Sequence, residues 1–273
     1  MAKERVLITV KTYPTLSRKY GETVCTAGIR QDGSWVRIYP VPFRRLEEEE
    51  RYKKYDWIEA ELIKHKSDPR PETRCPADMH QLVPVGHVDT KDEWRERRRL
   101  LMETAKVHTR LEQLIAAAKA NELSLAVFKP SAIKEFIVEE EDEREWPPAK
   151  MDEMRNKAAQ GDLFAEEWRK TFQVIRKLPY SFSYQFTDAD GREATLQILD
   201  WEIGALYWNC YDRHGHNDKI ALEKVRTKYV DQFLKTDLHF FLGTTQQYHF
   251  VAPNPWVIVG VFPVPHETQL ALL

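Results

Sequence analysis

Residues 23–39 have the sequence TVCTAGIRQDGSWVRIY, which contains two β-strand patterns joined by a turn signal. The turn signal is Asp32-Gly33, because these residue types tolerate the positive φ of a tight hairpin. In the second strand Val36 and Ile38 share one face and Arg37 lies on the other, since side chains alternate along a strand. The stretch therefore predicts a β-hairpin that presents a cation from one face of a sheet.

Strand and helix patterns continue on both sides of this hairpin. Short apolar or alternating runs bounded by turn residues predict strands, and apolar residues spaced three and four apart predict helices. The predicted strands are residues 6–10, 55–63, 123–127, 180–186, 193–199, 239–243 and 256–262, and the predicted helices are residues 90–121, 149–177, 201–211 and 218–233. This order predicts an α+β protein, with a small OB-like β-barrel built from the N- and C-terminal strands and a helical insertion.

Three regions follow from the order of the elements. We expect residues 1–88 to form an N-terminal β-barrel-like unit and residues 89–178 to form a mainly helical insertion. Residues 179–273 then form a C-terminal α+β part that packs on the first unit. The insertion begins at a capping-box pattern, in which Glu93 follows Thr90 by three residues.

The composition is that of a folded chain. The 273 residues include 8 Trp, 11 Tyr and 12 Phe, which need a core, so disorder of the whole chain is excluded. No stretch approaches about 18 consecutive apolar residues, so we expect no contact with a membrane. The first residues lack the apolar core of a signal peptide, and the 3 cysteines are too scattered for a disulfide framework. We therefore expect a cytoplasmic protein.

Charge is balanced over the chain but not along it. The formal net charge is −2, yet residues 1–45 hold nine Lys and Arg side chains against three Asp and Glu. A near-neutral protein can carry a basic face that attracts polyanions. The other interpretation is that these charges coat a solvated surface.

The residues that follow the first strand combine the side chains that bind nucleic acid. Cations bind phosphate, hydroxyls donate to phosphate oxygens, and tyrosine rings stack on bases. Loops between strands commonly carry such binding groups. The predicted nucleic-acid-binding residues are Lys11, Tyr13, Ser17, Arg18, Lys19, Tyr20 and Arg37. The alternative is a solvated loop with two partly buried tyrosines.

A second aromatic group lies on one face of the strand predicted at residues 180–186. Its members, which alternate with polar residues, are Tyr180, Phe182, Tyr184 and Phe186. Such a face could be a stacking platform for bases. The same alternation is found in any strand that packs one face on a core, and we favour that interpretation.

No catalytic signature is present, so the sequence leaves open whether the protein is an enzyme. Two pairs of carboxylates, Asp68 with Glu72 and Asp200 with Glu202, could hold a divalent ion or act in acid–base chemistry. They give the alternative of a metal-dependent phosphodiesterase or nuclease-like hydrolase. A further alternative is an adaptor that binds a larger protein partner through an aromatic surface. The histidines lack metal-ligand spacing, and we predict neither a metal nor a cofactor.

Both ends of the chain resemble a known family. Residues 17–29 read SRKYGETVCTAGI and residues 33–40 read GSWVRIYP, while residues 241–244 read FLGT before a final strand at 257–261. These segments resemble uncharacterised bacterial dual-OB domain proteins. The resemblance implies small β-barrels that bind nucleic acid through a basic groove and aromatic rings, and it implies no catalytic residues. It also implies an accessory factor in a bacterial defence or mobile-element system. The favoured partner is nucleic acid or a nucleotide, single-stranded in preference to duplex.

Overall fold

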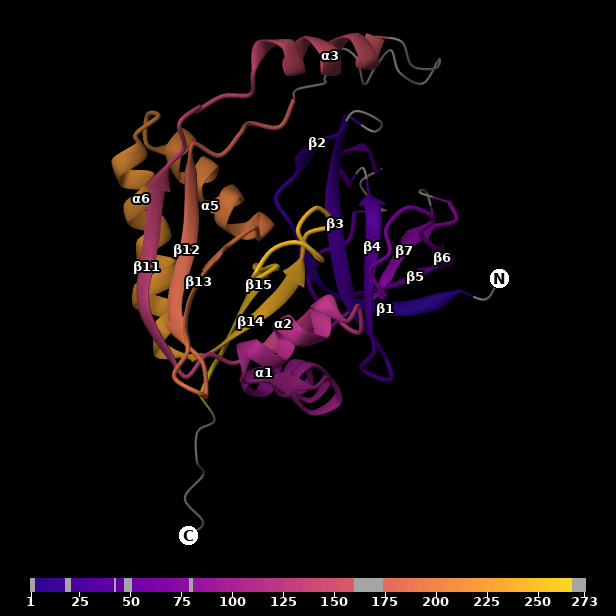
Figure 1. Cartoon of the computed structure of the whole chain (residues 1–273). Helices are drawn as coiled ribbons and strands as arrows, with labels where there is room; N and C mark the ends of the chain where they lie inside the picture. The colour runs from indigo at the N-terminus through magenta and orange to yellow at the C-terminus, as the bar shows by residue number, and fades with distance from the viewer. Residues whose placement is uncertain are drawn as a thin grey trace.

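The computed structural model describes residues 3–17, 21–41, 43–46, 51–78, 81–159 and 174–266. Figure 1 shows an N-terminal β-rich body on the right and a second body on the left, with the yellow C-terminal strands between them. The class is α+β, as the sequence predicts. Within the described ranges, no helix is long and apolar enough to cross a membrane.

The N-terminal region folds into one strongly curled sheet of eight strands. They are β1 (Glu4–Lys11), β2 (Thr15–Ser17), β3 (Gly21–Arg30), β4 (Trp35–Val41), β5 (Asp56–Ala60), β6 (Leu62–Lys64), β7 (Thr73–Pro76) and β8 (Val83–His87). Their order is β6-β7-β4-β3-β1-β5-β8, and β2 pairs with β3 outside this path. The predicted hairpin is confirmed as β3 and β4, in which Ala27 lies opposite Arg37.

The rest of the chain forms two smaller sheets. The strands are β9 (Val107–His108), β10 (Leu125–Phe128), β11 (Ala132–Glu140), β12 (Tyr180–Thr187), β13 (Glu193–Gln197), β14 (Asp237–Thr244) and β15 (Trp256–Val264). One sheet has the order β15-β14-β10-β9 and the other has the order β11-β12-β13. Strands from residues 107–128 therefore share a sheet with the C-terminal strands.

Five α-helices flank these sheets in the described part of the chain. They are α1 (Lys91–Arg98), α2 (Leu111–Lys119), α3 (Pro148–Ala159), α5 (Trp201–Arg213) and α6 (Asp218–Arg226). Short π-helical turns extend α1 and α6 at Arg99–Thr104 and Thr227–Gln232. Helices α5 and α6 cover one face of the three-stranded sheet, where Tyr207 and Val225 share a core with Phe182.

The curled sheet is buried on both of its faces along β1 and β3. Val6 and Ile8 belong to a core with Val36 and Ile38, whereas Leu7 and Val10 pack with Phe241 and Phe262 from the C-terminal strands. This explains why the start of β1 is a continuous apolar run rather than an alternating one. The core interpretation of the aromatic strand is confirmed for Phe182, Tyr184 and Phe186, which are buried, whereas Tyr180 is half-buried.

Three predictions about the fold need correction. The C-terminal strands pack on the N-terminal sheet but form their own sheet, so they do not complete its barrel. Within the described part of residues 89–178, the strand predicted at 123–127 is confirmed as β10, but β9 lies inside the helix predicted at 90–121. Thr90 makes no side-chain cap, and Glu93 has a positive φ of 54° in place of a capping-box conformation.

Candidate functional site

A cavity of about 370 Å³ lies between the N-terminal sheet and the second body. Residues from β2, β4, β12 and β15 and from the loops that follow β1, β6 and β14 line it. Its aromatic lining residues are Tyr13, Tyr39, Trp146, Tyr180 and Phe182. This volume is in the range of about 300–1,000 Å³ typical of small-molecule pockets, which often lie at domain interfaces.

The segment after β1 forms one wall of the cavity and joins the two bodies. The backbone N–H of Tyr13 donates to the carbonyl of Leu199 at 2.8 Å, and its hydroxyl donates to the carbonyl of Arg176 at 2.8 Å. A Cβ atom at Gly204 would lie 2.3 Å from the Tyr13 ring, so α5 needs glycine at that position. Burial raises the pKa of Tyr13 to about 12. Tyr13 is therefore a fixed part of the wall.

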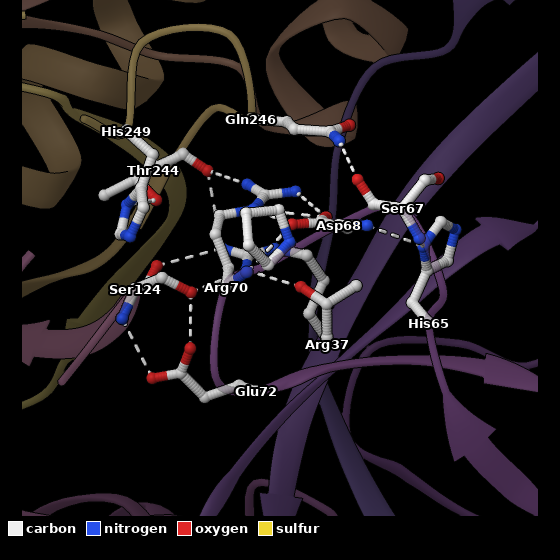
Figure 2. A network of polar contacts seen from close by, with 12 residues as sticks. Arg37, His65, Ser67, Asp68, Arg70, Glu72, Ser124, Thr244, Gln246 and His249 are labelled. Atoms are coloured by element: carbon white, nitrogen blue, oxygen red, sulfur yellow. Dashed lines mark hydrogen bonds and ion pairs between the residues drawn. The ribbon is translucent and has the colours of Figure 1, made fainter. Parts of the chain in front are cut away.

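A buried polar network lies at one end of the cavity (Figure 2). The Arg70 guanidinium lines the cavity and forms an ion pair with Asp68, with 2.5 Å between Nη2 and Oδ2. It also donates to the carbonyl of Thr244, from the end of β14. Burial opposes ionisation of Asp68, but the hydrogen bonds and the charge of Arg70 outweigh it and lower the pKa of Asp68. Arg70 is thus held in place while it faces the cavity.

Behind Arg70, the same network ties the two bodies together. Arg37 donates to the hydroxyl of Ser124 at 2.6 Å and to the carbonyl of Ser124 at 2.9 Å. Glu72 accepts from the backbone N–H of Ser124 at 2.9 Å and from its hydroxyl. The side chains of His249 and Asn121 lie 3.0 Å apart, and Asn121 donates to the carbonyl of Pro69 at 3.1 Å.

The predicted nucleic-acid-binding residues lie in several different environments. Tyr13 lines the cavity, whereas Lys11 lies outside its lining. Ser17 ends β2, two residues after the cavity-lining Thr15. Arg18, Lys19 and Tyr20 lie outside the described residues, so their role stays a prediction.

Arg37 requires a correction, because it does not reach the surface. Its side chain is 1% exposed and its donors are used inside the protein. Burial lowers the pKa of Arg37, and Arg70 lowers it further. The predicted contact of Arg37 with nucleic acid does not fit this buried position.

Lys11, at the end of β1, belongs to a second charged cluster outside the cavity lining. Its other members are Lys54, Asp200 and Glu202. Lys54 lies 3.1 Å from Asp200 and 3.2 Å from Glu202, and Asp200 is fully buried. The Lys11 ammonium lies 4.2 Å from the centre of the Phe43 ring. Burial lowers the pKa of Lys11 to about 8, although Glu202 raises it. Lys54 thus pairs with both carboxylates, while the Lys11 ammonium lies over aromatic rings.

The carboxylates of the hydrolase alternative do not converge. Asp68 and Glu72 belong to the network beside the cavity, while Asp200 and Glu202 pair with Lys54. Among the described residues, no group of three or more His, Cys, Asp and Glu side chains could hold a metal ion.

Sequence reasoning missed most of the cavity. Arg70 lies in a proline-bearing loop between Asp68 and Glu72, and Tyr39 ends the second strand of the predicted hairpin, so neither residue stands out as a binding residue in the sequence. Gln246 lies in a polar loop with no recognisable motif. The proline on either side of Arg70 was the available signal, since proline rigidifies a loop that must hold a side chain in place.

Comparisons with known proteins give two family matches. Residues 106–273 match the family described as Domain of unknown function (DUF8757), and residues 2–103 match the one described as Domain of unknown function (DUF8758). No curated protein matches the chain. Among solved structures, a murine DNA-binding protein bound to double-stranded DNA matches with a TM-score of 0.30 and 10% identity, covering 98% of this chain and 100% of the other. A TM-score of 0.30 does not indicate a shared fold.

Proposed function

The chain belongs to the family described as Domain of unknown function (DUF8757), and we propose from its cavity that it binds a nucleotide or single-stranded nucleic acid, with one base inside. The observation that carries this proposal is the combination of aromatic walls with a fixed arginine at one end. Aromatic side chains bind bases by stacking, and arginine donates to the acceptor atoms on base edges.

The charges around the cavity favour an uncharged base inside it. Arg70 is neutralised by Asp68, and Lys177 lies 3.7 Å from Glu141. A phosphate placed between these pairs would compete with carboxylates and would lose its hydration. A base needs only hydrogen bonds, and the residues that line the cavity include Arg70, Gln197 and Gln246. The base therefore enters and its phosphate stays outside.

The proposal is tested by filling the cavity. Ser181 on β12 lines it, so Ser181→Phe places a ring in the space that the base would occupy. The matched control is Thr195→Phe on the neighbouring strand β13, at an exposed position that does not line the cavity. Isothermal titration calorimetry with the common ribonucleoside and deoxyribonucleoside 5′-monophosphates measures affinity for both variants and the unsubstituted protein.

We expect Ser181→Phe to weaken mononucleotide binding by at least about tenfold, equivalent to about 1.4 kcal/mol, and Thr195→Phe to leave it unchanged. Equal loss in both variants would place the binding site elsewhere. If the unsubstituted protein bound neither mononucleotides nor single-stranded oligonucleotides at low salt, the function would be wrong and the adaptor would become the leading hypothesis.

A further inference from the structure

The loop between β14 and β15 presents two aromatic rings to solvent beside the cavity. Tyr248 is 50% exposed and Phe250 is 49% exposed. The loop begins with Thr245 and Gln246, which line the cavity. Large aromatic side chains are mostly buried in proteins, so two exposed rings in a loop that begins at the cavity indicate a contact surface.

These rings are held in place by the loop's own contacts. The backbone N–H of Tyr248 donates to the carbonyl of Thr245 at 3.2 Å. His249, between the two rings, is fully buried and lies 2.9 Å from the Thr244 hydroxyl. The His249 and Phe250 rings meet edge to face with centroids 4.5 Å apart. The buried histidine therefore anchors the loop while its neighbours face outward.

Two exposed lysines, Lys64 and Lys66, lie three residues and one residue before Ser67, which this loop contacts. Gln246 donates to the carbonyl of Ser67 at 2.8 Å, which ties the loop to the segment after β6 (Figure 2). Lys64 ends β6 and Lys66 lies in the segment itself, and both are exposed. Neither lysine has an ion-pair partner among the residues that the structure describes. Unpaired cations beside exposed rings match a chain that carries both phosphates and bases.

We infer that Tyr248, Phe250, Lys64 and Lys66 form a path for a single strand of nucleic acid that continues from the base in the cavity. This inference rests on the proposed function. The bases next to the one in the cavity stack on Tyr248 and Phe250, and their phosphates meet Lys64 and Lys66. The partner is single-stranded because a duplex keeps its bases stacked on each other and offers no free faces to these rings. The path also gives the phosphates excluded from the neutral cavity a place outside it.

The test compares mononucleotides with short labelled single-stranded oligonucleotides on the full chain. Fluorescence anisotropy at several salt concentrations measures the oligonucleotides, and calorimetry measures the mononucleotides. Tyr248→Ala with Phe250→Ala removes both rings, and Tyr248→Phe with Phe250→Tyr keeps them. Lys64→Ala with Lys66→Ala removes the cations. The matched control is Lys219→Ala with Lys224→Ala, which removes two exposed, unpaired lysines from α6.

We expect the unsubstituted protein to bind the oligonucleotide more tightly than the mononucleotide. Removing the rings should cost oligonucleotide affinity about fivefold to 150-fold per stacked base and leave mononucleotide affinity unchanged. The variant that keeps the rings should retain its affinity. Removing Lys64 and Lys66 should flatten the salt slope of oligonucleotide binding by about 1.4, at about 0.7 per phosphate contact, while the α6 control keeps the slope.

The outcomes separate this path from the cavity. If mononucleotides bind but oligonucleotides bind no better, or if the ring and lysine variants bind oligonucleotides normally, the path is wrong and the cavity stands. Equal or tighter binding of duplex, lost with the rings, also overturns the path. If neither kind of ligand binds the unsubstituted protein, the proposed function itself fails.

Discussion

The sequence predicts that Arg37 binds a ligand, but in the structure its buried side chain joins parts of the protein. Strand alternation correctly puts Arg37 on the face of β4 opposite Val36 and Ile38. What alternation cannot show is whether a second body covers that face. Here Ser124 and Thr244, both distant in sequence, supply the acceptors for Arg37.

Replacing Arg37 with Met should therefore destabilise the protein without acting at a binding surface. The substitution removes the buried hydrogen bonds that Arg37 donates to Ser124, and hydrogen bonds to a charged group contribute about 1.5–3 kcal/mol each. The Ser124 and Thr244 carbonyls keep other donors, namely the Thr244 N–H and Arg70. We expect the free energy of unfolding in urea to fall by at least about 2 kcal/mol. The control is the exposed Arg213→Met on α5, which should change it by less than about 0.5 kcal/mol. If Arg37→Met kept its stability and lost oligonucleotide binding, the phosphate-contact hypothesis would return.

The lowered pKa of Lys11 predicts that the free energy of unfolding depends on pH. Burial, reinforced by Lys54 and opposed by Glu202, Asp200 and Asp56, lowers the pKa of Lys11 from 10.5 to about 8. Below about pH 8 the amine is protonated in both states, so it contributes no slope. Between about pH 8 and 10.5 the unfolded chain binds more protons, so this group makes stability rise with pH.

The measurement is urea unfolding of the unsubstituted protein and of Lys11→Met across this pH range. The difference between their unfolding free energies should increase in favour of the unsubstituted protein as pH rises through the window. A difference that stays flat, or that falls with pH, would mean that the folded protein does not disfavour the Lys11 ammonium.

At the scale of elements, local patterns predict the strands better than the helices. The alternation in residues 180–186 correctly gives β12, and the Asp32-Gly33 turn gives the β3–β4 hairpin. The single helix expected from residue 90 to 121 is instead α1, a short strand and α2. The ring centroids of Trp94 and Phe262 lie 5.7 Å apart, and β9 pairs with β10. Such tertiary contacts override helix propensity and leave no trace in the local sequence.

Asp200 gives the prediction that belongs to this scale, because it joins three elements. Its side chain accepts from the N–H of Glu202 at 3.3 Å as the N-cap of α5, and from the N–H of Val261 on β15 at 3.3 Å. It also lies 3.1 Å from the buried ammonium of Lys54. Burial raises the pKa of Asp200, and the Lys54 charge opposes that shift.

Asp200→Ala should lower the free energy of unfolding by at least about 3 kcal/mol, because it removes the more buried of the two carboxylates that pair with Lys54 and also the acceptor of the Val261 N–H. The control is Asn217→Ala, which removes the ordinary N-cap of α6 and should cost about 0.5–2 kcal/mol. Thermal and urea unfolding measure both. If the free energy of unfolding fell by a similar amount in the two variants, Asp200 would act only as an N-cap and its ion pair with Lys54 would not stabilise the protein.

At the scale of the molecule, the boundary between the two family matches does not coincide with a boundary in the hydrophobic core. The matches cover residues 2–103 and 106–273. Leu7 and Val10 nevertheless share a buried cluster with Phe241 and Phe262. The sequence predicts that the C-terminal part packs on the N-terminal unit, but it cannot show that the cavity forms along this contact. Side chains that line the cavity come from segments more than 200 residues apart, such as Tyr13 and Thr245.

This shared core predicts that neither matched region folds alone. A fragment of residues 1–104 would expose Leu7, Val10 and the other apolar side chains of that face, and it would leave Arg37 without Ser124 and Thr244. We expect each half to be aggregated or to unfold without a cooperative transition by circular dichroism, since apolar surface of this kind drives association. Expressed together, residues 1–104 and 105–273 should co-purify and unfold in one transition, because the cluster and the polar network form only when both are present. If the first fragment alone showed a cooperative transition of native stability, the curled sheet would be an independent unit. The cavity would then be a joint between two domains that can part, and opening of that joint would be the step that admits a base.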